Sequence, residues 1–160
     1  MSELNPIERY CADLDALVES GMHKRMAFRR LIEIVESQMR TLDDATGPHP
    51  FLLDHEFADG IYKRTIHVPA GTLVVGMIHR YAHFCCITKG KVSVLTEDGA
   101  FVREAPFMFK SPAGAKRLVY HHSDTDWTTF HATRETDVEK IEHAIIAPTF
   151  DALECAGGVK

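Results

Sequence analysis

Apolar residues recur at helical spacing in the first part of the chain. The first run contains Tyr10, Leu14, Leu17 and Val18, and the second contains Phe28, Leu31, Ile32, Val35 and Met39. Each run places its apolar side chains on one face at intervals of three and four residues, as in an amphipathic helix. Asn5-Pro6 is typical of a helix start, because proline suits the first helical position. Two helices are therefore predicted, forming an arm over residues 1–46 that packs on the rest of the chain or on a second subunit.

The periodicity changes from helical to strand-like beyond this arm. Residues 47–60 are interpreted as a linker and the start of the next unit, because residues 46–50 contain too much proline and glycine to continue a helix. Short strand-like runs follow at 61–68, 72–78, 83–88, 91–96, 101–104, 107–110, 117–121 and 127–132. Glycine and proline turns separate these runs, which predicts a sandwich or a barrel. A short helix at 136–143 ends a domain over residues 61–150, and residues 151–160 are interpreted as a tail with a disordered end.

Composition narrows the class of protein. The chain has 160 residues, of which 45% are hydrophobic and 26% charged, as expected of one globular domain with its own core. A net charge of −5 gives no reason to expect general binding to nucleic acid. No apolar run approaches the roughly 20 residues that span a bilayer. The four cysteines show no Cys-x-x-Cys pair, which favours reduced thiols and a cytoplasmic location.

Two histidines in the segment 71–90 are the strongest candidates for chemistry. On a straight strand, His79 and His83 would lie on one face but roughly 13 Å apart, at about 3.3 Å per residue. Imidazole nitrogens lie only about 2 Å from a bound metal, so sharing one ion requires a bend between them, at residues 80–82. Two candidates exist for a third ligand: His131, on the predicted strand 127–132, and His121, four residues after Arg117. The alternative is that these histidines are structural and that the interior binds no metal.

Further polar side chains could line the same interior. Only one of Lys116 and Arg117 can point inward, because neighbouring strand residues face opposite sides. An inward arginine is costly unless it meets an anion, a carboxylate or a ligand, and a surface ion pair is the alternative. The complete set of candidate ligand-binding residues is Arg117, Tyr81, Arg64, Tyr62, Tyr120 and His121.

The spacing in this region resembles the two motifs of the cupin superfamily. Counting back from Gly90, His83 occupies the place of the family's glutamate, His79 that of its second histidine and Met77 that of its first histidine. The segment 112–117 resembles the second motif, with Arg117 at the place of the histidine. The resemblance implies a mainly β protein: a single cupin-type double-stranded β-helix, or jelly-roll barrel, preceded by the helical arm.

A narrower resemblance is to small cupin-like proteins encoded by tailed bacteriophages. The matching pieces lie at 69–72, 78–83, 89–99, 111–117 and 126–142. The resemblance makes His131, inside the last piece, the preferred third ligand over His121. This resemblance implies a phage accessory protein acting in the host cytoplasm, and cupins in general suggest a homodimer.

Two functions are expected from these observations. The first is binding of a small polar or anionic molecule inside the barrel, with one divalent metal (Fe, Mn, Ni or Zn) as the candidate cofactor. The alternative is a metal-dependent cupin enzyme of a dioxygenase, isomerase or hydrolase-like kind that uses His79, His83 and His131. Protonated imidazoles are poor ligands, so occupancy of the metal site is expected to fall below about pH 6.

Overall fold

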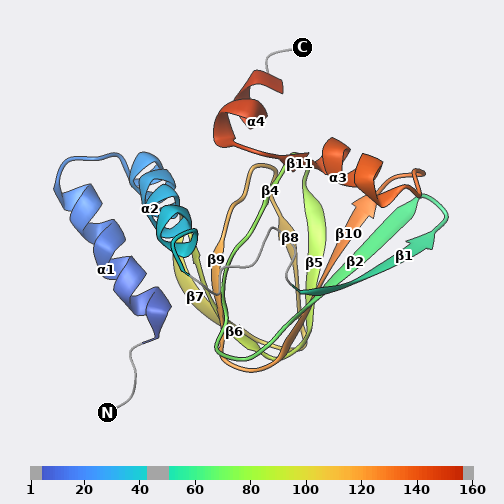
Figure 1. The fold of residues 1–160 in the computed structure, drawn as a ribbon, viewed down its shortest axis with the longest axis horizontal. Helices are drawn as coiled ribbons and strands as arrows, with labels where there is room; N and C mark the ends of the chain where they lie inside the picture. Colours follow the sequence, from blue (N-terminus) through green and yellow to red (C-terminus); the bar gives the residue numbers. More distant parts are fainter. Residues whose placement is uncertain (1–4, 43–50, 157–160) are drawn as a thin grey trace.

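The computed structural model describes residues 5–42 and 51–156, which form a helical arm, a β-barrel and two short helices (Figure 1). The arm consists of α1 (Pro6–Glu19) and α2 (Lys24–Met39). The helices that follow the barrel are α3 (Val138–Ile145) and α4 (Phe150–Ala156). None of the described helices is both long and apolar enough to cross a bilayer.

The barrel is built from two facing antiparallel sheets. The first has five strands in the order β1-β2-β10-β5-β8, and the second has four in the order β3-β9-β6-β7. The five-stranded sheet contains β1 (Leu52–Ala58), β2 (Ile61–Val68), β5 (His83–Lys89), β8 (Phe107–Ser111) and β10 (Thr125–Ala132). The four-stranded sheet contains β3 (Leu73–Val75), β6 (Lys91–Thr96), β7 (Gly99–Glu104) and β9 (Leu118–His121). The chain crosses repeatedly from one sheet to the other, which is the topology of a jelly roll.

A short two-stranded ladder closes one end of the barrel. It pairs β4 (Ile78–His79) with β11 (Ile146–Ala147), directly after α3. Figure 1 shows α3 and β11 at the same end of the barrel as β4.

Gly90 makes the tight turn from β5 in one sheet to β6 in the other. Its φ is +95°, and a Cβ there would lie 2.5 Å from the carbonyl oxygen of Asp124. Only glycine fits this position, both for its backbone conformation and for the space available. The turn predicted at Lys89-Gly90 is therefore present, and it packs closely against the backbone at Asp124 and Thr125.

The arm packs on the outer face of the four-stranded sheet of its own barrel. The shared core contains Ile7, Tyr10, Leu14, Ala27, Phe28, Leu31, Ile32 and Val35 of the helices and Leu95 and Leu118 of the sheet. Asn5 caps α1 by accepting a hydrogen bond from the backbone N–H of Ile7 at 3.0 Å. Its side-chain amide also donates to the Ser93 hydroxyl of β6 at 2.7 Å, which ties the start of the arm to the sheet. The arm was predicted to pack either on the rest of its own chain or on a second subunit. The structure shows it packed on its own barrel.

Some predicted boundaries differ from the structure. Strand β1 lies inside residues 47–60, interpreted above as a linker and the start of the barrel, and it pairs with β2 along its whole length. It is an edge strand with much of its surface exposed, so its apolar alternation is weak. The run 72–78 divides into β3 and β4, and α4 lies in the segment interpreted as a tail. Residues 46–50 of the linker and 157–160 of the tail lie outside the described residues.

Candidate metal centre and cavity

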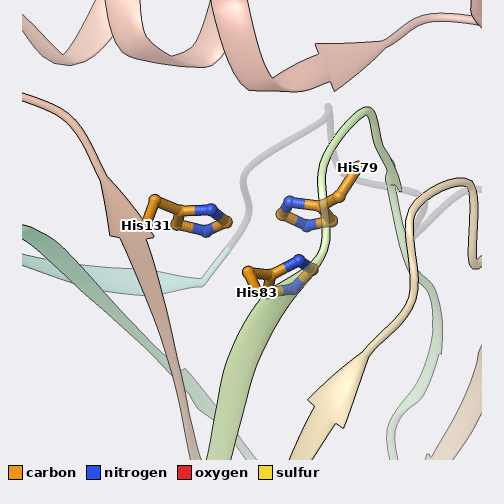
Figure 2. Close-up of side chains that lie close together, drawn as sticks. All are labelled: His79, His83 and His131. Atoms are coloured by element: carbon orange, nitrogen blue, oxygen red, sulfur yellow. The ribbon is translucent and has the colours of Figure 1, made fainter.

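Three histidines converge at the end of the barrel that α3 and β11 cover. His79 ends β4, His83 begins β5 and His131 lies near the end of β10 (Figure 2). Their ring centroids are 4.3 Å apart for His79 and His83, 4.7 Å for His83 and His131, and 5.1 Å for His79 and His131. Each ring offers one nitrogen, and these three atoms all lie within 4.8 Å of one another.

A bend at Arg80 brings the first two histidines together. The backbone N–H of Arg80 donates to the carbonyl of Ile145 at 2.7 Å, and its Nε donates to the carbonyl of Ile146 at 3.1 Å. The end of α3 and the strand after it therefore hold the bend in place. The prediction that His79 and His83 can meet only through a bend between them is confirmed.

The third histidine is placed by strand register. Strand β10 pairs with β5 so that Thr129 lies opposite Cys85, both on the inward face. His131 is two residues beyond Thr129 and His83 is two residues before Cys85, so both imidazoles point inward at the next level. The convergence predicted for His79, His83 and His131 thus follows from the bend at Arg80 and from the register between β10 and β5.

Hydrogen bonds orient the rings. The Nδ1–H of His83 donates to the carbonyl of Tyr81 at 3.1 Å, which leaves its Nε2 as the nitrogen with a lone pair. The Nε2 of His131 is 3.1 Å from the hydroxyl of Thr129. The Nδ1 of His79 is buried and has no hydrogen-bond partner among the residues that the structure describes. An unsatisfied buried nitrogen is costly, and coordination of a metal would satisfy it.

The three imidazoles are neutral at physiological pH. Burial, followed by repulsion from His83, His131, Arg64 and Arg117, lowers the pKa of His79 to about 2. Burial likewise lowers the pKa of His131 to about 4 and lowers the pKa of His83 below its usual range. A neutral imidazole is the form that binds a metal, and three nitrogen ligands with a fourth position open are typical of catalytic sites. The residues present therefore fit a divalent first-row transition metal.

A cavity of about 180 Å³ adjoins the histidines inside the barrel. Its polar lining consists of Arg64, His79, His83, Arg117, His121 and Thr129. Its apolar lining includes Phe51, Leu53, Ile66, Val68, Val74, Val75, Val119 and Trp127. The part of the chain that the structure describes contributes no aspartate or glutamate to this lining. The remaining interior is filled by a second apolar cluster around Ile87, Val92 and Val94.

The two arginines of the cavity differ in their partners. Arg64 lies 3.9 Å from the carboxylate of Glu142 on α3, so a negative charge accompanies it. Arg117 donates from Nη2 to the hydroxyl of Ser111 at 3.0 Å and lies over the ring of Phe109, 5.4 Å from its centroid. Within residues 5–42 and 51–156, no ion pair joins Arg117 to a carboxylate, and its Nε is buried without a hydrogen-bond acceptor. The neighbouring Lys116 points the other way, to Glu36 on α2.

The structure separates the predicted ligand-binding residues into two groups. Arg117, Arg64 and His121 line the cavity, as predicted. The three predicted tyrosines, Tyr62, Tyr81 and Tyr120, do not line the cavity. The cause differs for each of them.

Tyr62 is fully buried beyond the histidines. It faces inward, but it stacks beside His131 and its hydroxyl bonds Nδ1 of His55 at 2.7 Å. Tyr81 lies on the bend, where the alternation of strand faces is lost, and is 62% exposed. Tyr120 faces the helical arm and packs against its core, because it lies on the outer face of β9.

Sequence reasoning missed several residues of the site. Cys85 lines the cavity and shares the parity of His83, so alternation along β5 could have identified it. Burial raises the pKa of the Cys85 thiol to about 11, so it stays protonated. Ser111 follows no recognisable pattern, and Leu53 lies in the segment interpreted as a linker.

Comparison with known proteins supports the fold and leaves the activity open. No protein-family model matches the chain, and no curated protein matches its sequence. Ectoine synthase from P. lautus matches in structure with a TM-score of 0.50 and 11% identity, over 71% of this chain and 86% of that one.

Two further matches have TM-scores of 0.44. One is an RmlC-like cupin protein with a double-stranded β-helix fold from Methanocaldococcus jannaschii, at 12% identity over 58% of this chain and 89% of that chain. The other is the Schizosaccharomyces pombe Cnp3 cupin domain, at 19% identity over 57% of this chain. The match spans 64% of that domain, less than two thirds of its length.

At these identities the similarities concern the fold and not the activity. The resemblance to bacteriophage proteins, the homodimer and the cytoplasmic location are not tested by them and stay predictions. The two facing sheets, their strand order and the arm confirm the predicted fold class: the chain is a mainly β protein with N-terminal helices and a cupin-type double-stranded β-helix.

Proposed function

We propose that the barrel binds a divalent first-row transition metal through His79, His83 and His131 and a small anionic molecule beside it. The observation that carries the proposal is the set of three imidazoles, two buried and that of His79 half-buried, whose ligand nitrogens lie within 4.8 Å of one another. Three inward histidines are costly to bury without partners, and a shared ion would provide one partner for all three.

The donor set limits the choice of metal. Three imidazoles suit Fe²⁺, Ni²⁺ or Zn²⁺ better than they suit Mn²⁺, which prefers oxygen ligands. When bound, such an ion would act as a Lewis acid that attracts an oxygen atom of the ligand. The hydrogen bonds from His83 to Tyr81 and between His131 and Thr129 would keep the rings oriented toward it.

Arg117 supports the anionic character of the ligand. A guanidinium carries five N–H donors and remains charged in proteins. Ser111 accepts from one of them, and Phe109 covers one face of the group. An anionic oxygen in the cavity would satisfy donors that still point into a space lined by apolar side chains.

The metal-dependent enzyme is the second candidate function. Three protein ligands leave coordination positions for a substrate, as in catalytic sites. General acid–base chemistry requires a titratable group within hydrogen-bond reach of the reacting atom. The described lining offers no carboxylate for this role, and His121 lies toward the other end of β9. We therefore propose ligand binding as the first candidate function and catalysis as the second.

Metal analysis of purified protein tests the proposal. After incubation with Zn²⁺ or Fe²⁺ and removal of the excess, we expect about one ion per chain, consistent with one three-histidine site. His83→Ala should lose most of this metal, because two imidazoles bind an ion much more weakly than three. Circular dichroism of the variant establishes that the barrel is still folded.

His122→Ala is the matched control. His122 is adjacent to the barrel lining in sequence but faces outward, where its Nε2 bonds the Ser93 hydroxyl at 2.7 Å. This variant should bind as much metal as the unmodified protein. Equal metal content in His83→Ala and the unmodified protein would contradict the proposed site.

A further inference from the structure

The cavity is polar at one end and apolar beyond it, as strand register shows. Along β2 the inward side chains that line it are Arg64, Ile66 and Val68 in succession. On the neighbouring β10, Thr129 lies opposite Arg64 and Trp127 lies opposite Ile66. Arg64 and Thr129 therefore form a polar pair across the two strands. The next pair, Ile66 and Trp127, contributes no polar group except the indole N–H.

The opposite sheet repeats this order. Arg117 lies just before β9, Val119 lines the middle and His121 ends the strand. The four residue steps from Arg117 to His121 correspond to roughly 13 Å of extended chain. The backbone N–H of His121 donates to the carbonyl of Thr72 at 2.9 Å, so this end of the cavity lies where the chain enters β3.

His121 is a second polar group at the far end. It is only 3% exposed, and its buried Nδ1 has no hydrogen-bond partner within the described part of the chain. Burial is the main cause that lowers its pKa to about 4, so the ring is neutral and can donate or accept one hydrogen bond. Because His121 lines the cavity, its imidazole is suited to a hydroxyl or carbonyl group of a ligand.

The charges favour one anionic group and no more. Arg64 already has Glu142 beside it, whereas the partners of Arg117 within residues 5–42 and 51–156 are the neutral Ser111 and Phe109. A second anionic group would lie among valine, isoleucine and tryptophan side chains, where an unpaired charge is strongly disfavoured. A cationic ligand would meet two arginines and no carboxylate from the described lining.

We infer that the ligand class of this cavity is a small amphipathic monocarboxylic acid. Its carboxylate lies at Arg117 and the three histidines, and its apolar body lies along Val119, Ile66 and Trp127 toward His121. The inference rests on the proposed function, because it assigns the ligand of that same site. A volume of about 180 Å³ limits the acid to a short aliphatic or single-ring body.

A series of probes with six carbons tests this assignment. Binding to the metal-loaded protein is measured by calorimetry for hexanoate, hexan-1-ol, hexylammonium and adipate. Hexanoate should bind at least tenfold more tightly than each of the other three, because only it combines one anionic group with an apolar body. The compound 6-hydroxyhexanoate should bind at least as tightly as hexanoate, since its hydroxyl can reach His121.

Two neighbouring residues give a matched pair of variants. Arg117→Met should weaken hexanoate binding at least tenfold with the fold retained, because methionine can replace a buried charged side chain. Lys116→Met is the control, since Lys116 pairs with Glu36 outside the barrel, and it should bind hexanoate like the unmodified protein. His121→Leu should abolish any advantage of 6-hydroxyhexanoate over hexanoate.

The outcomes separate this inference from the proposed metal site. Adipate or hexylammonium binding as tightly as hexanoate, no binding of hexanoate, or unchanged binding by Arg117→Met would each overturn the ligand class. If the unmodified protein binds hexanoate but holds no metal after incubation with Zn²⁺ or Fe²⁺, the metal site is refuted and the ligand class is supported. Metal binding without hexanoate binding would do the reverse.

Discussion

The inner and outer faces of the five-stranded sheet shift the pKa values of their histidines in opposite directions. Inside, burial lowers the pKa of His131 on β10 to about 4, and its neighbours there are two other imidazoles. Outside, His67 on the adjacent strand β2 lies between two carboxylates, with Nε2 2.7 Å from Asp54 and Nδ1 2.7 Å from Asp126. The hydrogen bond to Asp54 and then that to Asp126 raise the pKa of His67.

The difference shows that strand parity decides what a histidine can do in this barrel. An inward imidazole is desolvated and neutral, so it keeps a lone pair for a metal or a hydrogen-bond donor. An outward imidazole with a carboxylate beside each nitrogen is stabilised as a cation, the form that has no lone pair to offer. The sheet thereby separates potential metal ligands from charged surface pairs on neighbouring strands.

Lysine substitutions on the two faces should give the largest contrast. His131→Lys places an amine among imidazoles and Tyr62. No ion pair joins His131 to a carboxylate among the residues that the structure describes. We expect it to lower the free energy of unfolding by roughly 3 kcal/mol or more, the cost of an uncompensated buried charge. His67→Lys keeps a cation between Asp54 and Asp126 and should change stability by less than about 1 kcal/mol.

Urea unfolding of the metal-free proteins measures both values. His131→Met, of similar size and without charge, separates the loss of the imidazole from the effect of the amine. Similar stabilities for His131→Lys and His67→Lys would show that the two faces are not as different as the structure indicates.

The same contrast explains which parts of the site could be predicted from sequence. His79 and His83 were found because a shared metal requires a bend between them, and this is local geometry that the sequence contains. Strand alternation shows only that one of Lys116 and Arg117 points inward. The choice of Arg117 came from its place in the resemblance to the second cupin motif, and the choice of His131 came from the segment that resembles the phage cupin-like proteins.

The tyrosines were predicted to line the cavity from parity alone, and parity failed for tertiary reasons. The bend that joins the two histidines turns Tyr81 out to solvent, at 62% exposure. Tyr62 has inward parity but lies beyond His131, in a cluster with Ile141 and Ile145 of α3. Which end of a strand a helix covers, and which face an arm occupies, depend on long-range packing that one sequence does not reveal.

Strand β1 illustrates the same limit for the fold. Its edge position leaves many of its side chains exposed, so the alternation that identified other strands is weak. Leu53 nevertheless completes the lining of the cavity. The predicted barrel was therefore right in class and incomplete at the strand that forms one side of its opening.

Acid should destabilise the metal-free protein through the inner histidines. The pKa values of His79 and His131 lie near 2 and 4 in the folded protein and near 6.5 once unfolded. As pH falls below 6.5, the unfolded chain takes up protons that the folded chain does not. The free energy of unfolding should therefore fall by about 1.4 kcal/mol per pH unit for each such imidazole, less where cavity water screens the charge.

Urea unfolding at pH 7, 6 and 5 tests this slope. Removing one titrating group in His131→Asn should make the slope shallower by up to that amount. The same lowered pKa values revise the expectation that metal occupancy falls below about pH 6. Protons compete with a metal only near the pKa of the ligand, so occupancy should persist to about pH 5 or lower.

The smallest expected effect concerns the outer histidine and has the opposite sign. Because the pKa of His67 is raised in the folded protein, its stabilisation is complete below the unfolded value of 6.5. That stabilisation is lost as pH rises through the folded pKa, where the ring gives up its proton and one charged hydrogen bond. His67 and Asp54 are partly exposed, at 31% and 57%, so solvent screening keeps the contribution below about 1 kcal/mol.

His67→Gln should therefore be less stable than the unmodified protein at pH 5.5 and nearly equal to it at pH 9. A stability difference that grows toward alkaline pH would show that His67 is not held as a cation by Asp54 and Asp126.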